Sequence, residues 1–139
     1  LELLRANARI SLASLARNVR FSKSAVKYRL DRLVEVGAIK SFFALVDSQV
    51  YGLKLSVVFD LTVEPQVIQD VAMHLAKYPE VVRVYELTTT PQLHVHVLFR
   101  DQEAMEKFMR SKLYTLTGIK EVNTGMIIKR YKTDLTLQI

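Results

Sequence analysis

The sequence predicts an α+β fold in which a small helical domain precedes a β-rich domain. Apolar residues repeat at helical spacing up to residue 36, and a strand–helix–strand pattern occurs twice after residue 52. The charge is also uneven, because residues 1–50 hold nine Lys or Arg against four acids, while residues 51–139 hold eleven against ten. We therefore predict two domains, residues 1–50 and residues 51–139, and a polyanionic partner for the first.

The composition of the 139-residue chain allows a packed core and excludes several classes of protein. Half of the residues are hydrophobic, and with 4 Gly and 3 Pro the chain is unlike a low-complexity disordered protein. No apolar run approaches the roughly 18 residues of a membrane span, and no secretory signal is recognisable. The absence of cysteine excludes disulfides and thiolate metal sites, so we expect a cytoplasmic protein that does not enter a membrane.

Three short helices are expected in the first domain, over residues Leu1–Asn7, Leu12–Val19 and Lys23–Val36. Ser11 and Ser22 precede the second and third helices, where a hydroxyl can accept hydrogen bonds from unpaired amides of the first turn. Gly37 follows the third helix, at the position that favours a left-handed residue. The residues expected to face inward are Leu12, Leu15, Ala16 and Val19 in the second helix, and Val26, Leu30, Leu33 and Val34 in the third.

The segment IKSFFALV, Ile39–Val46, is β-prone and apolar on both faces. We predict a strand there that needs a partner, followed by a linker over residues 47–52. The second domain then contains two strand–helix–strand units. Its predicted strands are Leu53–Val63, Val81–Thr88, a strand around Leu93–Phe99, and Ile119–Tyr131. Its two predicted helices begin near Pro65 and Asp101 and end near Tyr78 and Tyr114.

This order of elements is the ferredoxin-like βαββαβ arrangement. Two right-handed crossovers place both helices on one face of a four-stranded sheet. The other face of the sheet would then be bare. An exposed apolar sheet face indicates association with another molecule or another copy of the chain.

Two short helices that are joined by a tight turn, the second with cations outside, describe a helix-turn-helix. In that motif the start of the second helix meets base edges in the major groove of DNA, and nearby cations contact phosphates. An ordinary three-helix bundle with solvated cations is the alternative. The candidates near the bases are Ser22, Lys23, Ser24, Lys27 and Tyr28, and those near the phosphates are Arg17, Arg20, Arg29 and Arg32.

The whole chain resembles the Lrp/AsnC, or feast/famine, transcriptional regulators. Three segments carry the resemblance in the family's order: LLRANARISLASLARNVRFSKSAVKYRLDRLVEVGAIKSFFALVD, TTTPQLHVHVLFRD and GIKEVNTGMIIKRYK. The resemblance implies an N-terminal helix-turn-helix domain, a connecting strand, and a ferredoxin-like regulatory domain that dimerises through its sheet. It also implies operator DNA as a partner of a homodimer, or of a tetramer or octamer, and for many members an amino-acid effector bound between subunits.

Two positions depart from the family's pattern. Arg20 lies where the turn between the helices often has Gly, so the turn must close with a Cβ in place. The family's effector loop usually reads Thr-Gly-x-x-Asp, so in TTTPQ the Gly is replaced by Thr89 and the Asp by Gln92. A neutral amide binds an α-ammonium more weakly than a carboxylate does, and we expect a weak or absent response to ordinary amino acids. The candidate effector-binding residues are Thr88, Thr89, Thr90 and Gln92.

Little in the sequence indicates an enzyme or a metalloprotein. His94 and His96 lie two apart on one strand, a spacing that could place two imidazoles on one metal ion. Because no cysteine or adjacent third ligand accompanies them, we expect paired polar positions on a sheet surface or subunit interface. No phosphate-binding glycine loop and no catalytic set stand out, so we predict no cofactor and no catalysis. The alternative function is a small-molecule-binding ferredoxin-like oligomer or enzyme whose basic domain does not read DNA.

Overall fold

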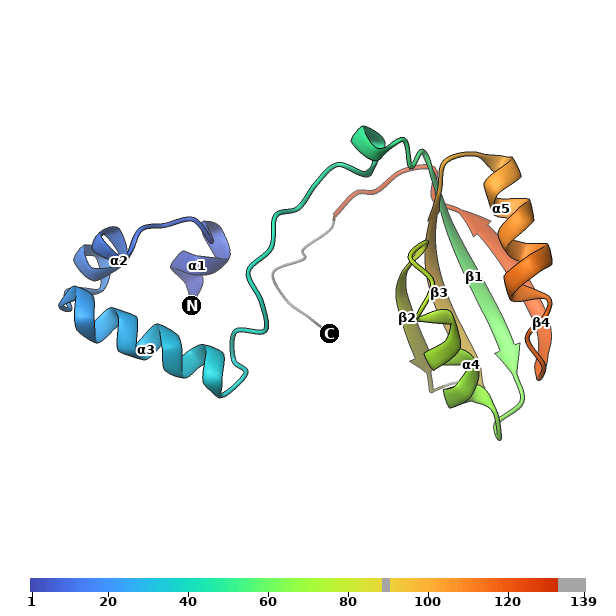
Figure 1. Cartoon of the computed structure of the whole chain (residues 1–139), viewed down its shortest axis with the longest axis horizontal. Coiled ribbons are helices and arrows are strands. Elements are labelled where there is room, and N and C mark those ends of the chain that lie inside the picture. The colour runs from blue at the N-terminus through green and yellow to red at the C-terminus, as the bar shows by residue number, and fades with distance from the viewer. Residues whose placement is uncertain (89–90, 133–139) are drawn as a thin grey trace. The chain divides into compact units, whose positions relative to one another are not determined.

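The computed structural model describes residues 1–88 and 91–132 (Figure 1). Among these residues the chain divides into two compact units, the first running to Leu45 and the second beginning at Val46. The domain border predicted after residue 50 lies slightly further along the chain and stays a prediction. No helix in the described ranges is both long and apolar enough to cross a membrane.

The first unit contains three short helices, α1 Glu2–Ala6, α2 Leu12–Val19 and α3 Lys23–Glu35 (Figure 1). Both predicted serine caps are confirmed. Ser11 Oγ accepts the Ser14 amide at 3.1 Å, and Ser22 Oγ accepts the amide three residues on at 3.2 Å. Gly37 has a φ of 72°, the left-handed conformation predicted for it after α3. The caps fix where α2 and α3 begin and therefore keep the turn between them short.

The core of the first unit is small. Its buried residues are Leu15, Ala16 and Val26, with Leu3, Leu4 and Ile10 packed against them. The prediction that three further residues face inward is wrong, because Leu12, Val19 and Val34 are 36%, 41% and 46% exposed. Three short helices cover only the middle of each apolar stripe, so its ends remain in contact with solvent.

The segment after α3 is extended but is not a strand. Between Ile39 and Val46 no described residue pairs with another strand, which contradicts the strand predicted there. A strand is stabilised by hydrogen bonds to a neighbouring strand, and the described part of one chain offers no neighbour to this segment. Phe42, Phe43 and Leu45 are consequently 52%, 59% and 73% exposed.

The predicted linker, residues 47–52, contains a short 3-10 helix, η1 Ser48–Tyr51. Asp47 caps this helix, since its side chain accepts the Gln49 amide at 2.9 Å. Gly52 ends it with a φ of 73°. The linker is therefore more ordered than its composition suggested. Asp47 caps the start of one helical turn, and Gly52 adopts the conformation that ends it.

The second unit is built on one four-stranded sheet in the order β2-β3-β1-β4. Every strand pair in the sheet is antiparallel. The strands are β1 Leu55–Val63, β2 Val81–Leu87, β3 Gln92–Phe99 and β4 Ile119–Met126, and the helices are α4 Ile68–Leu75 and α5 Gln102–Phe108 (Figure 1). The order of elements and strands confirms the predicted ferredoxin-like βαββαβ arrangement.

Both helices pack on the same face of this sheet. The alternation predicted for β1 and β3 is confirmed by their buried residues, which are Val57, Phe59, Leu61, Val63, Leu93, Val95, Val97 and Phe99. α4 contributes Leu75, and α5 contributes Phe108, whose ring stacks on Phe59 with 6.3 Å between centroids. A π-helical turn, η2 Met109–Leu113, continues α5 and buries Leu113 against the same core.

Several elements are shorter than predicted. β4 ends at Met126 rather than Tyr131, because its partner β1 begins at Leu55 and Met126 pairs with Val57 near that end. The helix predicted from Pro65 to Tyr78 is reduced to α4, since residues 65–67 and 76–77 form turns. The strand ends are thus set by where a partner strand ends, which the pattern of apolar residues does not show.

Within the second unit, no described element covers the opposite face of the sheet. Its central side chains are Val58 and Asp60 on β1 and His94, His96 and Leu98 on β3, all partly exposed. The face is bare as predicted, but its surface is mixed rather than apolar. It therefore combines apolar area with groups that can titrate or form hydrogen bonds.

Candidate nucleic-acid interface

The turn between α2 and α3 is closed by an arginine in a left-handed conformation. Arg20 has φ 56° and ψ 42°, and in the described part of the chain it is the one non-glycine residue with positive φ. Its amide donates to the Arg17 carbonyl at 3.4 Å. The next amide, of Phe21, donates to the Ala16 carbonyl at 3.1 Å. Glycine adopts this conformation at lower cost, so the arginine is held with some backbone strain.

Three exposed cations surround an open hollow beside this turn. The hollow is lined by Ala13, Ala16, Arg17, Arg20, Phe21 and Lys23. Arg17 donates to Ser14 Oγ at 3.3 Å, whereas the side chains of Arg20 and Lys23 have no hydrogen-bond or ion-pair partner among the described residues. Free neighbouring cations of this kind attract phosphate oxygens.

Two of the other predicted cations are paired with acids on α3. Lys27 Nζ lies 2.7 Å from Asp31 Oδ2, and Arg32 Nη1 lies 2.5 Å from an oxygen of Glu35. Sequence reasoning missed these pairs, although the spacings i,i+4 and i,i+3 are those at which helix side chains meet. Both pairs are exposed and therefore weak, so a phosphate or base edge can compete for the cation.

Arg29 is held by an aromatic residue that sequence reasoning did not select. Its guanidinium carbon lies 4.0 Å from the centroid of the Phe21 ring, and Phe21 is 45% exposed. Such stacking limits the freedom of the arginine without neutralising its charge. The Arg29 guanidinium is therefore held beside Phe21, the residue that follows Arg20 in the turn between α2 and α3.

The exposed face near the start of α3 also presents two neutral polar residues. Tyr28 is 69% exposed, and Ser24 is exposed beside the first turn. Ser22 is less available than predicted, because its hydroxyl caps the helix and lies 3.1 Å from Ser24 Oγ. Tyr28 is thus free to meet a base edge, as are Ser24 once its hydroxyl leaves Ser22 and Lys27 once it leaves Asp31.

The candidate effector loop is only partly described. Thr88 is exposed just after β2, while Thr89 and Thr90 lie outside the described residues. Gln92 is the first residue of β3 and is partly buried, paired with Thr62 of β1 and Leu87 of β2. The structure therefore places Gln92 at the end of the sheet, next to the loop.

The two histidines predicted as paired polar positions do contact each other. The Nε2 atoms of His94 and His96 are 2.8 Å apart, and His94 Nδ1 lies 2.5 Å from Asp60 Oδ1. Burial lowers the pKa of His96, and the electrostatic effects of His94, Arg83 and Arg130 lower it further against the opposing effect of Asp60. Within the described residues no three His, Cys, Asp or Glu converge to hold a metal ion.

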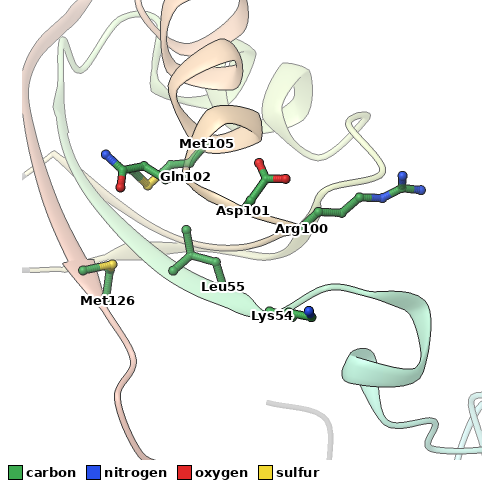
Figure 2. Close-up of a pocket in the computed structure, with 7 residues that line it drawn as sticks. All are labelled: Lys54, Leu55, Arg100, Asp101, Gln102, Met105 and Met126. Carbon is green, nitrogen blue, oxygen red and sulfur yellow. The ribbon is translucent and has the colours of Figure 1, made fainter.

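A second hollow, of about 340 Å³, lies at one end of the sheet of the second unit. It is lined by Lys54, Leu55, Arg100, Asp101, Gln102, Met105 and Met126. Figure 2 shows Leu55, Met105 and Met126 grouped together while the Arg100 guanidinium extends away. The Asp101 carboxylate caps α5, accepting the Ala104 amide at 2.8 Å. The hollow is therefore mainly apolar at its centre, and its nearest acid is already engaged.

Comparison with known families agrees with this division of the chain. Residues 1–40 match the winged helix-turn-helix DNA-binding family, and residues 56–137 match the Lrp/AsnC ligand binding domain, a match over more than half of the chain. The chain therefore belongs to the Lrp/AsnC family of transcriptional regulators, and its first unit is the DNA-binding helix-turn-helix.

Individual relatives support the same assignment. The uncharacterised HTH-type transcriptional regulator PH0140 of Pyrococcus horikoshii is 29% identical over 127 residues, which cover 91% of this chain and 80% of that protein. The HTH-type transcriptional regulator Ptr1 of Methanocaldococcus jannaschii is 25% identical over 100% of this chain and 94% of its own. These relatives are named as regulators rather than enzymes.

Solved structures confirm the fold. The transcriptional regulator NMB0573 of Neisseria meningitidis, in complex with L-Met, aligns with a TM-score of 0.90 at 24% identity, over 99% of this chain and 91% of that chain. AsnC of E. coli aligns with a TM-score of 0.86 at 20% identity, over 96% and 90% of the two chains.

Proposed function

We propose that the chain binds a near-palindromic operator as a dimer in the cytoplasm, with α3 of each copy in the major groove. The main support for the proposal is that three exposed cations lie together at the turn that precedes α3, namely Arg17, Arg20 and Lys23. These cations would contact phosphates on the sides of the groove. Ser24, Lys27 and Tyr28 would meet the base edges and select the sequence.

Two surfaces that one chain leaves without a partner support the proposed dimer. The apolar segment Ile39–Val46 is extended and exposed, which suits a strand that pairs with a second copy. The open face of the sheet offers a second contact. Because Leu45 is 73% exposed, Leu45→Lys should fold normally but shift the dimer towards monomer in light scattering after gel filtration. An unchanged mass at low micromolar concentration would remove this segment from the interface.

We further propose that assembly depends on protein contacts rather than on ordinary amino acids. One structural neighbour is described as a complex with L-Met, so a response to amino acids has to be tested here directly. Gln92 supports a weak response, because its neutral amide lacks the charge that pairs with an α-ammonium group. Isothermal titration against the twenty amino acids is expected to show no micromolar binding, and one such ligand would mean that other residues form the site.

Selection of binding sites from random duplex DNA tests the proposed function. We expect two related half-sites about one helical turn apart. If each first unit neutralises about four phosphates, the dimer neutralises about eight, and log K against log salt should slope near −7. A flat salt response and no enriched sequence would favour the alternative of a metabolite-binding oligomer.

A further inference from the structure

Three side chains on the open face of the sheet, those of Asp60, His94 and His96, are connected in series by two hydrogen-bond contacts. Asp60 on β1 and His94 on β3 lie directly opposite each other in the antiparallel ladder, and His96 follows two residues along β3 on the same face. Asp60 Oδ1 is 2.5 Å from His94 Nδ1, and His94 Nε2 is 2.8 Å from His96 Nε2. The imidazole of His94 therefore bridges a carboxylate on one side and a second imidazole on the other.

The tautomers follow from the carboxylate. Asp60 accepts a hydrogen bond from Nδ1–H of His94, which leaves Nε2 of a neutral His94 ring as a lone pair. The contact between the two Nε2 atoms then requires a single hydrogen, carried by His96. If a neutral His96 instead carries its hydrogen on Nδ1, both Nε2 atoms present lone pairs to the same small space. A metal ion binds the lone pair of a neutral imidazole, so it can take the place of this hydrogen once the His96 hydrogen is on Nδ1.

We propose that His94 and His96 form a two-imidazole site for a borderline divalent transition metal ion, with Asp60 orienting His94. A carboxylate on the second nitrogen of a ligating histidine fixes the tautomer and raises the basicity of the ring. The sequence offered no third group beside the two histidines, whereas the strand register supplies Asp60 from 34 residues away.

The spacing of the two nitrogens selects among metals. Two neighbouring ligands at about 2.0 Å and 90° lie roughly 2.8 Å apart, the spacing of tetragonal Cu²⁺ or Ni²⁺, whereas tetrahedral Zn²⁺ needs about 3.3 Å. The hydrogen-bonded spacing of 2.8 Å is closer to the tetragonal value, so we expect Cu²⁺ and Ni²⁺ to bind more tightly than Zn²⁺. Since no third protein ligand converges here among the described residues, water or the histidine pair of a second copy completes the coordination.

The test uses the full chain without a polyhistidine tag, freed of metal with a chelator and titrated calorimetrically with NiCl₂, then with CuCl₂ and ZnCl₂. We expect saturable binding with one ion per chain, or one per two chains if two copies share the ion. His96→Gln should weaken Ni²⁺ binding at least about tenfold, and Asp60→Asn about 10- to 100-fold. His74→Gln is the matched control, because His74 lies on α4 and contacts Tyr78 instead, at 2.9 Å.

Circular dichroism must show that each variant keeps the fold of the wild-type chain. Electron paramagnetic resonance of the Cu²⁺-loaded chain gives an independent result, with coupling to two nitrogens from each chain that holds the ion in the wild type and to one from each in His96→Gln. Absence of binding up to about 1 mM, or equal affinity in His96→Gln, would overturn the site and leave a shared hydrogen as the whole interaction. Because no DNA is present, the outcome does not depend on the proposed operator binding.

Discussion

The two units of the chain obtain their stability from very different cores. Among the described residues, thirteen buried side chains form one continuous core in the second unit, whereas three are buried in the first. A small helical unit buries a modest share of its surface and is marginal for that reason. The first unit also collects cations at its turn, and these repel each other in the free protein. The unit that meets DNA should therefore be the less stable one and should gain stability when DNA binds.

The largest expected effect tests the core of the second unit. Phe59 is fully buried and contacts the rings of Phe99 and Phe108. Phe59→Ala removes these contacts and leaves a cavity, so we expect a loss of about 3–5 kcal/mol in the unfolding free energy. Hydrogen exchange measured by mass spectrometry should show faster exchange in residues 55–126, with little change in the first unit.

The matched change in the first unit is Leu15→Ala, which removes a side chain that is 6% exposed. Because fewer neighbours surround it, its cost should fall at the lower end of the 2–5 kcal/mol range for such changes. Its faster exchange should be confined to α1, α2 and α3, and saturating operator DNA should restore protection. Loss of protection across the whole chain in either variant would show that the two units unfold together, which breaks the comparison.

A smaller effect concerns the ion pair between Lys112 and Glu80 at the edge of the core of the second unit. Lys112 Nζ lies 2.8 Å from Glu80 Oε1 and 4.5 Å from the centroid of the Tyr78 ring, and Glu80 Oε2 is buried without a partner among the described residues. Lys112→Met preserves apolar packing but leaves the carboxylate unpaired, so we expect a loss of about 1–3 kcal/mol in urea unfolding at pH 7. Adding Glu80→Gln should recover part of it.

The stabilisation by the Lys112–Glu80 ion pair should decrease as the pH falls. Burial alone would raise the pKa of Glu80, but the hydrogen bond from Lys112, a hydrogen bond from the Glu80 backbone and the charge of Lys112 together outweigh it, and the pKa lies below its usual value. A carboxyl with a lowered pKa in the folded state stabilises the protein above its unfolded-state pKa and loses that contribution as the pH falls. The difference between wild type and Lys112→Met should therefore shrink below about pH 4. A difference that stays constant down to pH 3 would contradict the assignment.

In the first unit, Lys27 tests whether a cation that is paired with Asp31 in the free protein can still contact a base. Lys27→Ala should cost about 1–3 kcal/mol in binding to the selected operator in a bandshift titration, if the ammonium contacts a base. Folding should be unaffected, because the Lys27–Asp31 pair is exposed and such pairs contribute little. Asp31→Asn is the control, since it frees Lys27 and should bind at least as tightly as the wild type. Equal affinity after Lys27→Ala would remove it from the recognition surface.

The two units also differ in how much of them the sequence predicts. In the second unit, strict alternation from Val57 to Val63 is enough to identify a strand with one buried face, and two such units predict the topology. In the first unit, the capping serines predict where α2 and α3 begin. The strand predicted over Ile39–Val46 does not form within one chain, because β-propensity does not show whether a partner strand exists.

The candidate site was less predictable than the fold for a similar reason. The cations of the helix-turn-helix are visible in the sequence, but their partners depend on geometry. The Phe21–Arg29 stack requires the left-handed turn at Arg20, and the Asp60–His94 contact requires the β1–β3 register. The pairings of Lys27 with Asp31 and of Arg32 with Glu35 could have been obtained from spacing along one helix.

The smallest expected effect separates backbone strain from charge at Arg20. Arg20→Gly relieves the left-handed conformation and should raise the stability of the first unit by up to about 1 kcal/mol, after the entropy that glycine adds to the unfolded chain. Arg20→Ala keeps the strain and should change stability less. Both variants remove one phosphate contact per chain, so the salt slope of a dimer should flatten by about 1.8. If the salt slopes of both variants equal that of the wild type, Arg20 does not touch DNA. If both slopes flatten and only Arg20→Gly is more stable than the wild type, the turn retains a strained arginine because its charge binds phosphate.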